Sequence, residues 1–143
     1  LFLVDCKMNF SSLDLEECII NFQNMINFPR YNNFSKLNNI HGISKSFYLI
    51  NSFPGVNNNE VYFSENNSSF NDNATSIIIG NNDWSSSWSK KKNGDFLFPL
   101  MSNSQKQRVT SFRFGVNVLI YALTGNYKTD QVHVPEILKR IKK

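Results

Sequence analysis

Hydrophobic and polar positions along the chain form short apolar runs and longer runs with helical spacing. The apolar runs at residues 1–5 and 76–79 predict buried parallel strands, and the β-branched isoleucines of the second predict a central strand. Strand-like segments are also predicted at 46–50 and 60–65, with a Pro-Gly turn between them, whereas 30–45 is predicted to be irregular. Strands that alternate with helices predict an α/β domain with three layers.

Two longer segments repeat apolar residues at the spacing of an amphipathic helix. The first is capped by Ser11 or Ser12 and ends before Pro29. The second follows a Ser-x-x-Gln capping box at 102–105 and stops at Thr-Gly-Asn, residues 124–126. Its apolar stripe is expected to face the sheet and consists of Val109, Phe112, Val116, Leu119 and Leu123.

Length and composition indicate one globular domain with a sizeable core. The chain has 143 residues, of which 41% are hydrophobic, and no run approaches the ~18 apolar residues of a membrane span. It begins at Leu1 without an initiator methionine, so we expect it to lie within a larger gene product. The net charge is +4, and basic residues gather at 90–92 and 139–143. Their position at predicted element ends indicates solvated termini, and no nucleic-acid partner is expected.

Cysteine and glycine patterns give little support for a cofactor or a metal. The spacing of Cys6 and Cys18 suggests neither a disulfide scaffold nor a metal site. No phosphate-binding glycine loop is present, and no His, Cys and carboxylate residues cluster with metal-ligand spacing. We therefore expect no cofactor and no metal. Gly115, within the second predicted helix, is expected to permit close contact with a neighbouring strand.

Polar side chains follow the ends of two predicted strands. Asp5 ends the first, and Asn82, Asp83 and Trp84 follow the second. Ligands of doubly wound sheets bind beyond the carboxyl ends of the strands, so these residues could line one crevice. Asp83 could equally cap the turn of DWSSSWS, with one of Trp84 and Trp88 packing inward. Ligand contact and capping both stay open.

Further candidates lie elsewhere along the chain. His41, in a polar stretch, could be a base or hydrogen-bonded scaffolding. Arg113 and Asn117 share a helix face opposite the apolar stripe, and we expect them to tie that helix to the Asn82 turn by buried hydrogen bonds. Cys6 lacks the small flanking residues of a nucleophile elbow, which disfavours a Cys6–His41 hydrolytic pair. We assign no catalytic residue; the expected ligand-binding set is Asp5, His41, Asn82, Asp83, Trp84, Arg113 and Asn117.

Three blocks of the sequence resemble a known family. They are SFYLINSFPG at 46–55, SIIIGNNDWSSSW at 76–88 and RFGVNVLIYALTGNYKTDQVHVPEIL at 113–138. Together they resemble the C-terminal half of bacterial domain-of-unknown-function family 4159, in the version found in alphaproteobacterial membrane proteins. The similarity is in register from Leu1 to the end. Where the family usually has Asp-Thr-Arg-Asp this chain has DCKM from Asp5, so the first Asp is kept but the Arg and the second Asp are not.

The resemblance implies a flavodoxin-like, class I glutamine amidotransferase-like fold, of which 1–143 is the C-terminal part. The opening strands would lie upstream of Leu1, together with transmembrane helices that anchor the parent protein in a bacterial inner membrane. The family carries no established reaction, and two hypotheses remain. The preferred one is a non-catalytic domain of the cell envelope that binds an unknown protein partner or small ligand in the strand-end crevice. The alternative is a hydrolase or amidotransferase-like enzyme in which Asp5, His41 and Asp83 converge on an upstream nucleophile.

Overall fold

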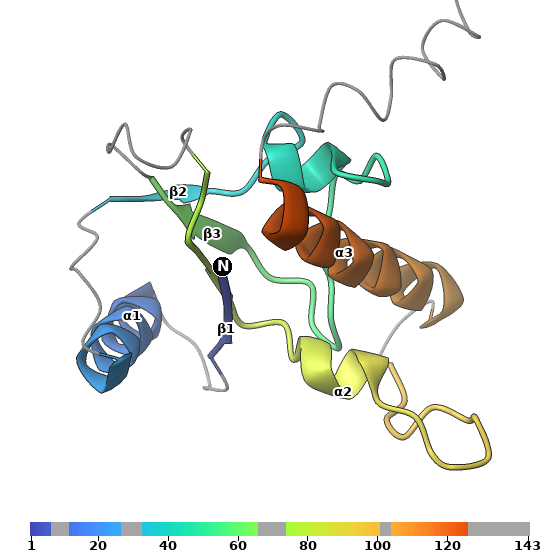
Figure 1. The fold of residues 1–143 in the computed structure, drawn as a ribbon. Helices are drawn as coiled ribbons and strands as arrows, with labels where there is room; N and C mark the ends of the chain where they lie inside the picture. The colour runs from blue at the N-terminus through green and yellow to red at the C-terminus, as the bar shows by residue number, and fades with distance from the viewer. Residues whose placement is uncertain (7–11, 27–32, 66–73, 101–103, 126–143) are drawn as a thin grey trace, which may run out of the picture.

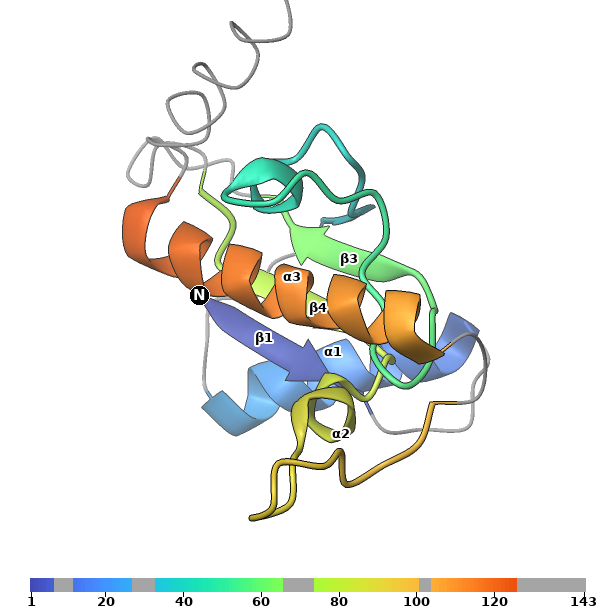
Figure 2. The same ribbon diagram turned by 90° about the vertical axis from the view of Figure 1, so that its right-hand side faces the viewer.

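The computed structural model of the chain describes residues 1–6, 12–26, 33–65, 74–100 and 104–125. The elements in chain order are β1 (Phe2–Asp5), α1 (Ser12–Ile26), β2 (Phe34–Lys36), the 3₁₀ helix η1 (Gly42–Lys45), β3 (Val61–Ser64), β4 (Ile77–Gly80), α2 (Trp84–Trp88) and α3 (Ser104–Thr124). Figure 1 shows their arrangement, and Figure 2 shows it from the side on which α3 lies in front of the sheet.

The four strands form one mixed sheet in the order β1-β4-β3-β2. β1 pairs with β4 in parallel, whereas the β4–β3 and β3–β2 pairs are antiparallel. Helices α1 and α3 lie on opposite faces of this sheet (Figures 1 and 2). The predicted α/β class is therefore confirmed, and β4 is an internal strand, as its isoleucines predicted.

The core is centred on β4, whose three isoleucines are fully buried. Ile78 belongs to the cluster on the α3 side of the sheet, together with Trp84 and Phe114. Ile77 and Ile79 alternate with it and so point to the opposite face. Burial of each isoleucine is worth roughly 1.5–3 kcal/mol, which makes β4 the strand on which both layers depend.

Between residues 30 and 65 one predicted strand is absent, and one strand lies where none was predicted. The segment 46–50 is not a strand; it follows η1, and the N–H groups of Phe47 and Tyr48 donate to the side chain of Asn117 on α3. A side chain of a helix thus satisfies backbone groups that a neighbouring strand would otherwise satisfy. Conversely, β2 lies in the stretch predicted to be irregular and pairs with β3. The strand predicted at 60–65 is confirmed as β3.

Helix α3 has the predicted extent, but its apolar stripe faces away from the sheet. The stripe residues are 36–74% exposed, with Phe112 the least and Leu123 the most exposed. The buried face is instead a mixture of polar and aromatic residues: Arg108, Ser111, Phe114, Asn117 and Tyr121. The helix stops at Thr124, and Gly125 takes the left-handed conformation (φ 58°) expected of a glycine stop. The capping positions Ser11 and Ser102, like Pro29, lie outside the described residues.

Gly115 packs against a helix rather than a strand. A Cβ at this position would lie 3.0 Å from the ring of Trp88 on α2, so the glycine lets the indole approach the α3 backbone. The expectation of contact with a strand is therefore wrong, because the neighbour of Gly115 is the Trp88 ring of α2. Among the described residues, no helix is both long and apolar enough to cross a membrane.

A disulfide joins Cys6, directly after β1, to Cys18 on α1, with 6.1 Å between the two Cα atoms. The spacing of the two cysteines had suggested no disulfide, and the structure shows one. Their separation of 12 residues is uninformative, whereas the packing of α1 beside β1 brings the two side chains together. The Phe2 and Phe22 rings also meet between these elements, with their centroids 5.6 Å apart. The disulfide therefore links the sheet covalently to the layer formed by α1.

Candidate functional site

The Asp5 carboxylate lies at the point where the two parallel strands end. It accepts hydrogen bonds from the backbone N–H groups of Asn82 (3.2 Å), Asp83 (3.1 Å) and Trp84 (2.7 Å). The parallel register, which places Asp5 opposite Gly80, brings these groups together as predicted from the strand ends. Burial raises the pKa of Asp5 above its ordinary value, although the three N–H donors act in the opposite direction.

Asp83 caps the short helix α2, which is one of its two predicted roles. Its side chain accepts a hydrogen bond from the N–H of Ser86, and its backbone is left-handed with φ 49°. Trp84 is 1% exposed and donates its indole N–H to the Phe53 carbonyl at 2.9 Å. Trp88 is half-buried and donates to the Ser111 carbonyl at 3.0 Å. Both indoles therefore pack within the protein.

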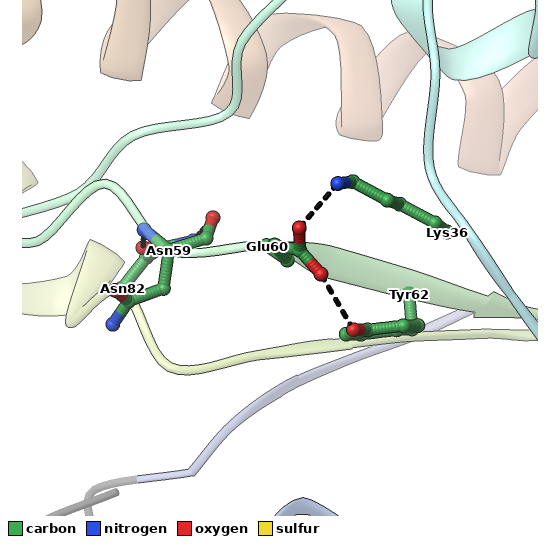
Figure 3. Close-up of polar contacts among 5 residues, drawn as sticks. All are labelled: Lys36, Asn59, Glu60, Tyr62 and Asn82. Carbon is green, nitrogen blue, oxygen red and sulfur yellow. Dashed lines mark hydrogen bonds and ion pairs between the residues drawn. The ribbon is translucent and has the colours of Figure 1, made fainter. Parts of the chain in front are cut away.

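Asn82 joins the end of β4 to the start of β3 and is fully buried. Its Oδ1 accepts from the N–H of Asn59 at 2.6 Å, and its Nδ2 donates to the carbonyls of Asn59 and Phe53. Figure 3 shows Asn59 and Asn82 side by side. Asn59 in turn donates its side-chain amide to the Asn81 carbonyl at 2.8 Å. Asn82 is thus used in structural hydrogen bonds.

A second polar group in Figure 3 consists of side chains on β2, on β3 and at Glu60, just before β3. Glu60 is paired with the Lys36 ammonium and accepts a hydrogen bond from the Tyr62 hydroxyl at 2.7 Å. The hydrogen bond from Lys36, and then that from Tyr62, lowers the pKa of Glu60, while the same carboxylate raises the pKa of Tyr62. Exposed pairs of this kind contribute little stability.

His41 lies at the opposite end of β4 from Asp5. Its Nε2 is 3.1 Å from the Thr75 hydroxyl, just before β4 begins, and its Nδ1 accepts from the N–H of Ile43 as the cap of η1. Burial, with a smaller contribution from the Lys45 charge, lowers the pKa of His41 from 6.5 to about 4. The alternative enzymatic hypothesis required His41 to converge with Asp5 and Asp83; the structure separates His41 from them by the length of β4.

Asn117 and Arg113 on α3 have partners other than the predicted ones. Asn117 is fully buried; it accepts from the N–H groups of Phe47 and Tyr48 and donates to the carbonyls of Ile43 and Tyr48. Its predicted buried hydrogen bonds exist, but they hold the segment after η1 and not the turn at Asn82. Arg113 is exposed, and its guanidinium carbon lies 5.2 Å from the centroid of the Tyr48 ring.

A large open groove lies between the first half of α3 and residues 96–100, with a volume of about 1010 Å³. Apolar side chains from both elements line it, including Phe96, Phe98 and Phe112. Arg108, Arg113 and Lys91 also line it. A smaller hollow of about 310 Å³ lies between β1 and α1 beside Asp5 and the disulfide. Of the seven predicted site residues, Arg113 lines the groove and Asp5 lines the hollow.

Arg108 holds the wall of this groove in place. Its guanidinium donates to the carbonyls of Ser87 and Phe98, both at 2.7 Å, and its carbon lies 3.8 Å from the centroid of the Phe96 ring. Sequence reasoning missed the groove because it turned the α3 stripe toward the sheet. The available signal was the apolar run FLFPL at 96–100, which is too close to the helix to form a separate strand layer.

A comparison with protein families gives a match over most of the chain. The model of a family described as a domain of unknown function (DUF4159) matches residues 4–123, which include Asp5, the β4 turn and nearly all of α3. Among curated proteins, none matches the chain. Within the part of the chain that the structure describes, no three His, Cys, Asp or Glu side chains are grouped so as to hold a metal ion.

Proposed function

We propose a function for this chain, which belongs to the DUF4159 family. It is a non-catalytic binding domain of a membrane-anchored protein of the bacterial cell envelope. Its binding surface is the groove between α3 and residues 96–100, and not the strand-end turn. The observation that carries this proposal is the contrast between two surfaces: one is occupied by internal hydrogen bonds, and the other is open and apolar.

The strand-end turn is used for structure. The backbone N–H groups of residues 82–84 all donate to Asp5, the Asn82 side chain makes bonds to Asn59 and Phe53, and Trp84 is buried. A site that binds ligand leaves convergent polar groups directed at a cavity. These groups are directed at one another, and they stabilise the corner from which α2 and the groove wall extend.

The groove has the composition of a recognition surface. Aromatic residues and arginine are enriched in protein interfaces, and apolar surface with a polar rim marks docking sites. Phe96, Phe98 and Phe112 are 36–43% exposed around this groove. Arg113 is exposed at its rim, next to the Tyr48 ring.

The disulfide supports a location in the envelope. Disulfides persist in oxidising compartments such as the bacterial periplasm and are rare in the cytosol. The Cys6–Cys18 bond therefore favours placement of this domain on the outer side of the inner membrane. The anchor is proposed to be the transmembrane helices that the family resemblance implies upstream of Leu1.

The proposed fold is flavodoxin-like, in the manner of class I glutamine amidotransferases, with its remaining strands added beside β1. Two features support it: β1 and β4 are parallel, and helices lie on both faces of the sheet. In such a fold the crevice at the carboxyl ends of β1 and β4 is the usual ligand site. Here Asp5 and the turn after β4 close that position, which is why recognition is assigned to the groove.

Site-specific photocrosslinking in the full-length parent protein, in its native membrane, tests this proposal. A photoreactive phenylalanine analogue at Phe112 is expected to give a discrete adduct, identified by mass spectrometry. The same analogue at Ile40, which is 76% exposed and does not line the groove, is the matched control. Equal labelling from both positions would contradict the proposal. Turnover of amide or ester substrates that is lost in a still folded Asp5→Asn variant would support the enzymatic alternative instead.

A further inference from the structure

The exposed stripe of α3 has the spacing of a helix-docking seam. Its residues, Val109, Phe112, Val116, Leu119 and Leu123, are separated by 3, 4, 3 and 4 positions, as are the a and d positions of a heptad repeat. The stripe extends over about 21 Å of helix, at 1.5 Å per residue. Leu119 and Leu123 are 59% and 74% exposed. A seam with this period fits the apolar face of another helix, because successive side chains of the seam can all pack against a partner only if its apolar residues have the same period.

Positive charge flanks this seam at one end. With Val109 at position a, Arg108 falls at the preceding g position and Arg113 at the following e position. These positions set partner choice in helix pairs through charge. Lys91 lies on the opposite wall of the groove. Among the described residues, no carboxylate pairs with Arg108, Arg113 or Lys91, and the two arginines contact only carbonyls and rings.

We infer that the occupant of the groove is an amphipathic helix of a partner protein, with an apolar heptad seam flanked by glutamate or aspartate. This inference rests on the proposed function and names the chemistry of its partner. The partner's apolar residues pack along Phe112, Val116 and Leu119, and its carboxylates face Arg113 and Lys91. The charges lie beside the first half of α3, whereas the second half of the seam is apolar, so the acidic residues belong at one end of the partner helix.

A synthetic peptide series tests this inference on the whole 143-residue chain. The probe is a fluorescein-labelled 21-residue helical peptide, about the length of α3, with Leu at a and d and Glu at e and g of its charged end. Its twin carries Lys in place of Glu, and a scrambled peptide of the same composition removes the seam. Fluorescence anisotropy is expected to show at least about tenfold tighter binding of the Glu peptide than of the Lys twin, with a difference that shrinks at high salt.

Variants of the protein locate the binding. Arg113→Glu is expected to weaken the Glu peptide by about fivefold or more and to favour the Lys twin. Lys92→Glu makes the same change in net charge outside the groove lining and is expected to change binding by less than about twofold. Leu119→Asp places a carboxylate in the seam and is expected to weaken the peptide more than about tenfold. Arg113 in the groove and Leu119 in the seam are both exposed, and circular dichroism melting checks that the fold is intact.

Four results would overturn the inference. Equal binding of the Glu and Lys peptides would show that charge does not contribute to recognition. Equal binding of the scrambled peptide would show that the apolar seam does not contribute. A dimer of the unmodified chain in light scattering that Leu119→Asp converts to monomer would make a second copy the occupant. Absence of peptide binding together with specific Phe112 adducts in the membrane would refute the acidic helix but leave the binding domain intact. Absence of both would refute the proposed function as well.

Discussion

The Asp5 carboxylate accepts the backbone N–H of Trp84 at 2.7 Å, a bond that links the end of β1 to the first turn of α2. The same carboxylate also holds the two preceding N–H groups, so one side chain fixes the corner after β4. That corner sets the direction of α2, against which α3 packs through Gly115 and Trp88. The position of the groove therefore depends on Asp5, which lies more than 75 residues before the turn whose N–H groups it binds.

Removal of the Asp5 carboxylate should destabilise the domain. Asp5→Ala leaves three half-buried N–H groups without their acceptor, and we expect the free energy of unfolding to fall by about 2–4 kcal/mol. Asp5→Asn, which keeps one oxygen, should cost less. Urea denaturation followed by tryptophan fluorescence measures the loss. Asp95→Ala, in the exposed turn before Phe96, is the control and should stay within about 0.5 kcal/mol. Equal stability of Asp5→Ala and the control would refute the role of the carboxylate.

Stability should fall on acidification because of His41. Its folded pKa of about 4 lies below the ordinary 6.5, so protons bind the unfolded chain better, and the stabilisation present above pH 6.5 is lost as the pH falls toward 4. Protonation also places a hydrogen on Nδ1, which now accepts from Ile43. His41→Asn keeps a capping acceptor without titrating. Melting temperatures measured from about pH 7 to about pH 4.5 should fall more steeply in the wild type than in His41→Asn; parallel curves would contradict the assignment.

Asn117 should be among the least replaceable residues of α3. Its side chain makes four hydrogen bonds to the backbone of residues 43–48 and is fully buried. Asn117→Leu leaves those groups unpaired and should lower the free energy of unfolding by about 3–5 kcal/mol. Asn117→Asp retains the acceptor oxygen but places a negative charge against the carbonyls of Ile43 and Tyr48, so it should also lower the free energy of unfolding. Thr110→Ala, one helix face away, should cost less than about 1 kcal/mol; a comparable loss there would point to general helix damage.

The disulfide should contribute a large share of the stability. Replacement of both cysteines by alanine is expected to cost about 2–4 kcal/mol, since the bond closes a short loop between β1 and α1. Reducing agent should lower the urea midpoint of the wild type to about that of the double variant, and it should leave the midpoint of the double variant unchanged. Alkylation of thiols in intact cells, before lysis, gives the state of Cys6 in its own compartment. Free thiols there would argue against the proposed envelope location.

Gly55 should tolerate no side chain, although its backbone is ordinary. A Cβ there would lie 2.0 Å from the carbonyl oxygen of Asn82, a backbone atom that cannot move aside cheaply. Gly55→Ala should therefore prevent stable folding or cost more than about 3 kcal/mol. Gly94→Ala is the matched comparison, because φ is 91° there but no atom lies within 4 Å. Its expected cost is about 1–2 kcal/mol. Thermal melts of both variants show which one is less stable. A lower melting temperature for Gly94→Ala than for Gly55→Ala would show that the contact between Gly55 and Asn82 is not rigid.

Local patterns in the sequence were sufficient for the elements that carry their own signal. The isoleucines of β4 predicted a central strand, and the extents of α1 and α3 followed from apolar spacing and a glycine stop. The neighbourhood of Asp5, Asn82 and Asp83 was also predictable, because parallel strands end at the same edge of a sheet. Each of these features depends on near neighbours or on a general rule of sheets.

The tertiary structure decided which surfaces those elements bury and which distant groups pair. The spacing of Val109 to Leu123 shows that α3 has an apolar face but not what covers it. The other face turns inward because Asn117, Arg108 and Phe114 have their partners in η1, in α2 and at Phe53. Contacts separated by 70 residues, like the pairing of Cys6 with Cys18 across two layers, leave no local periodicity. The strand-end corner could thus be foreseen from the sequence, whereas the groove exists only once α3 has been oriented by its buried polar side chains.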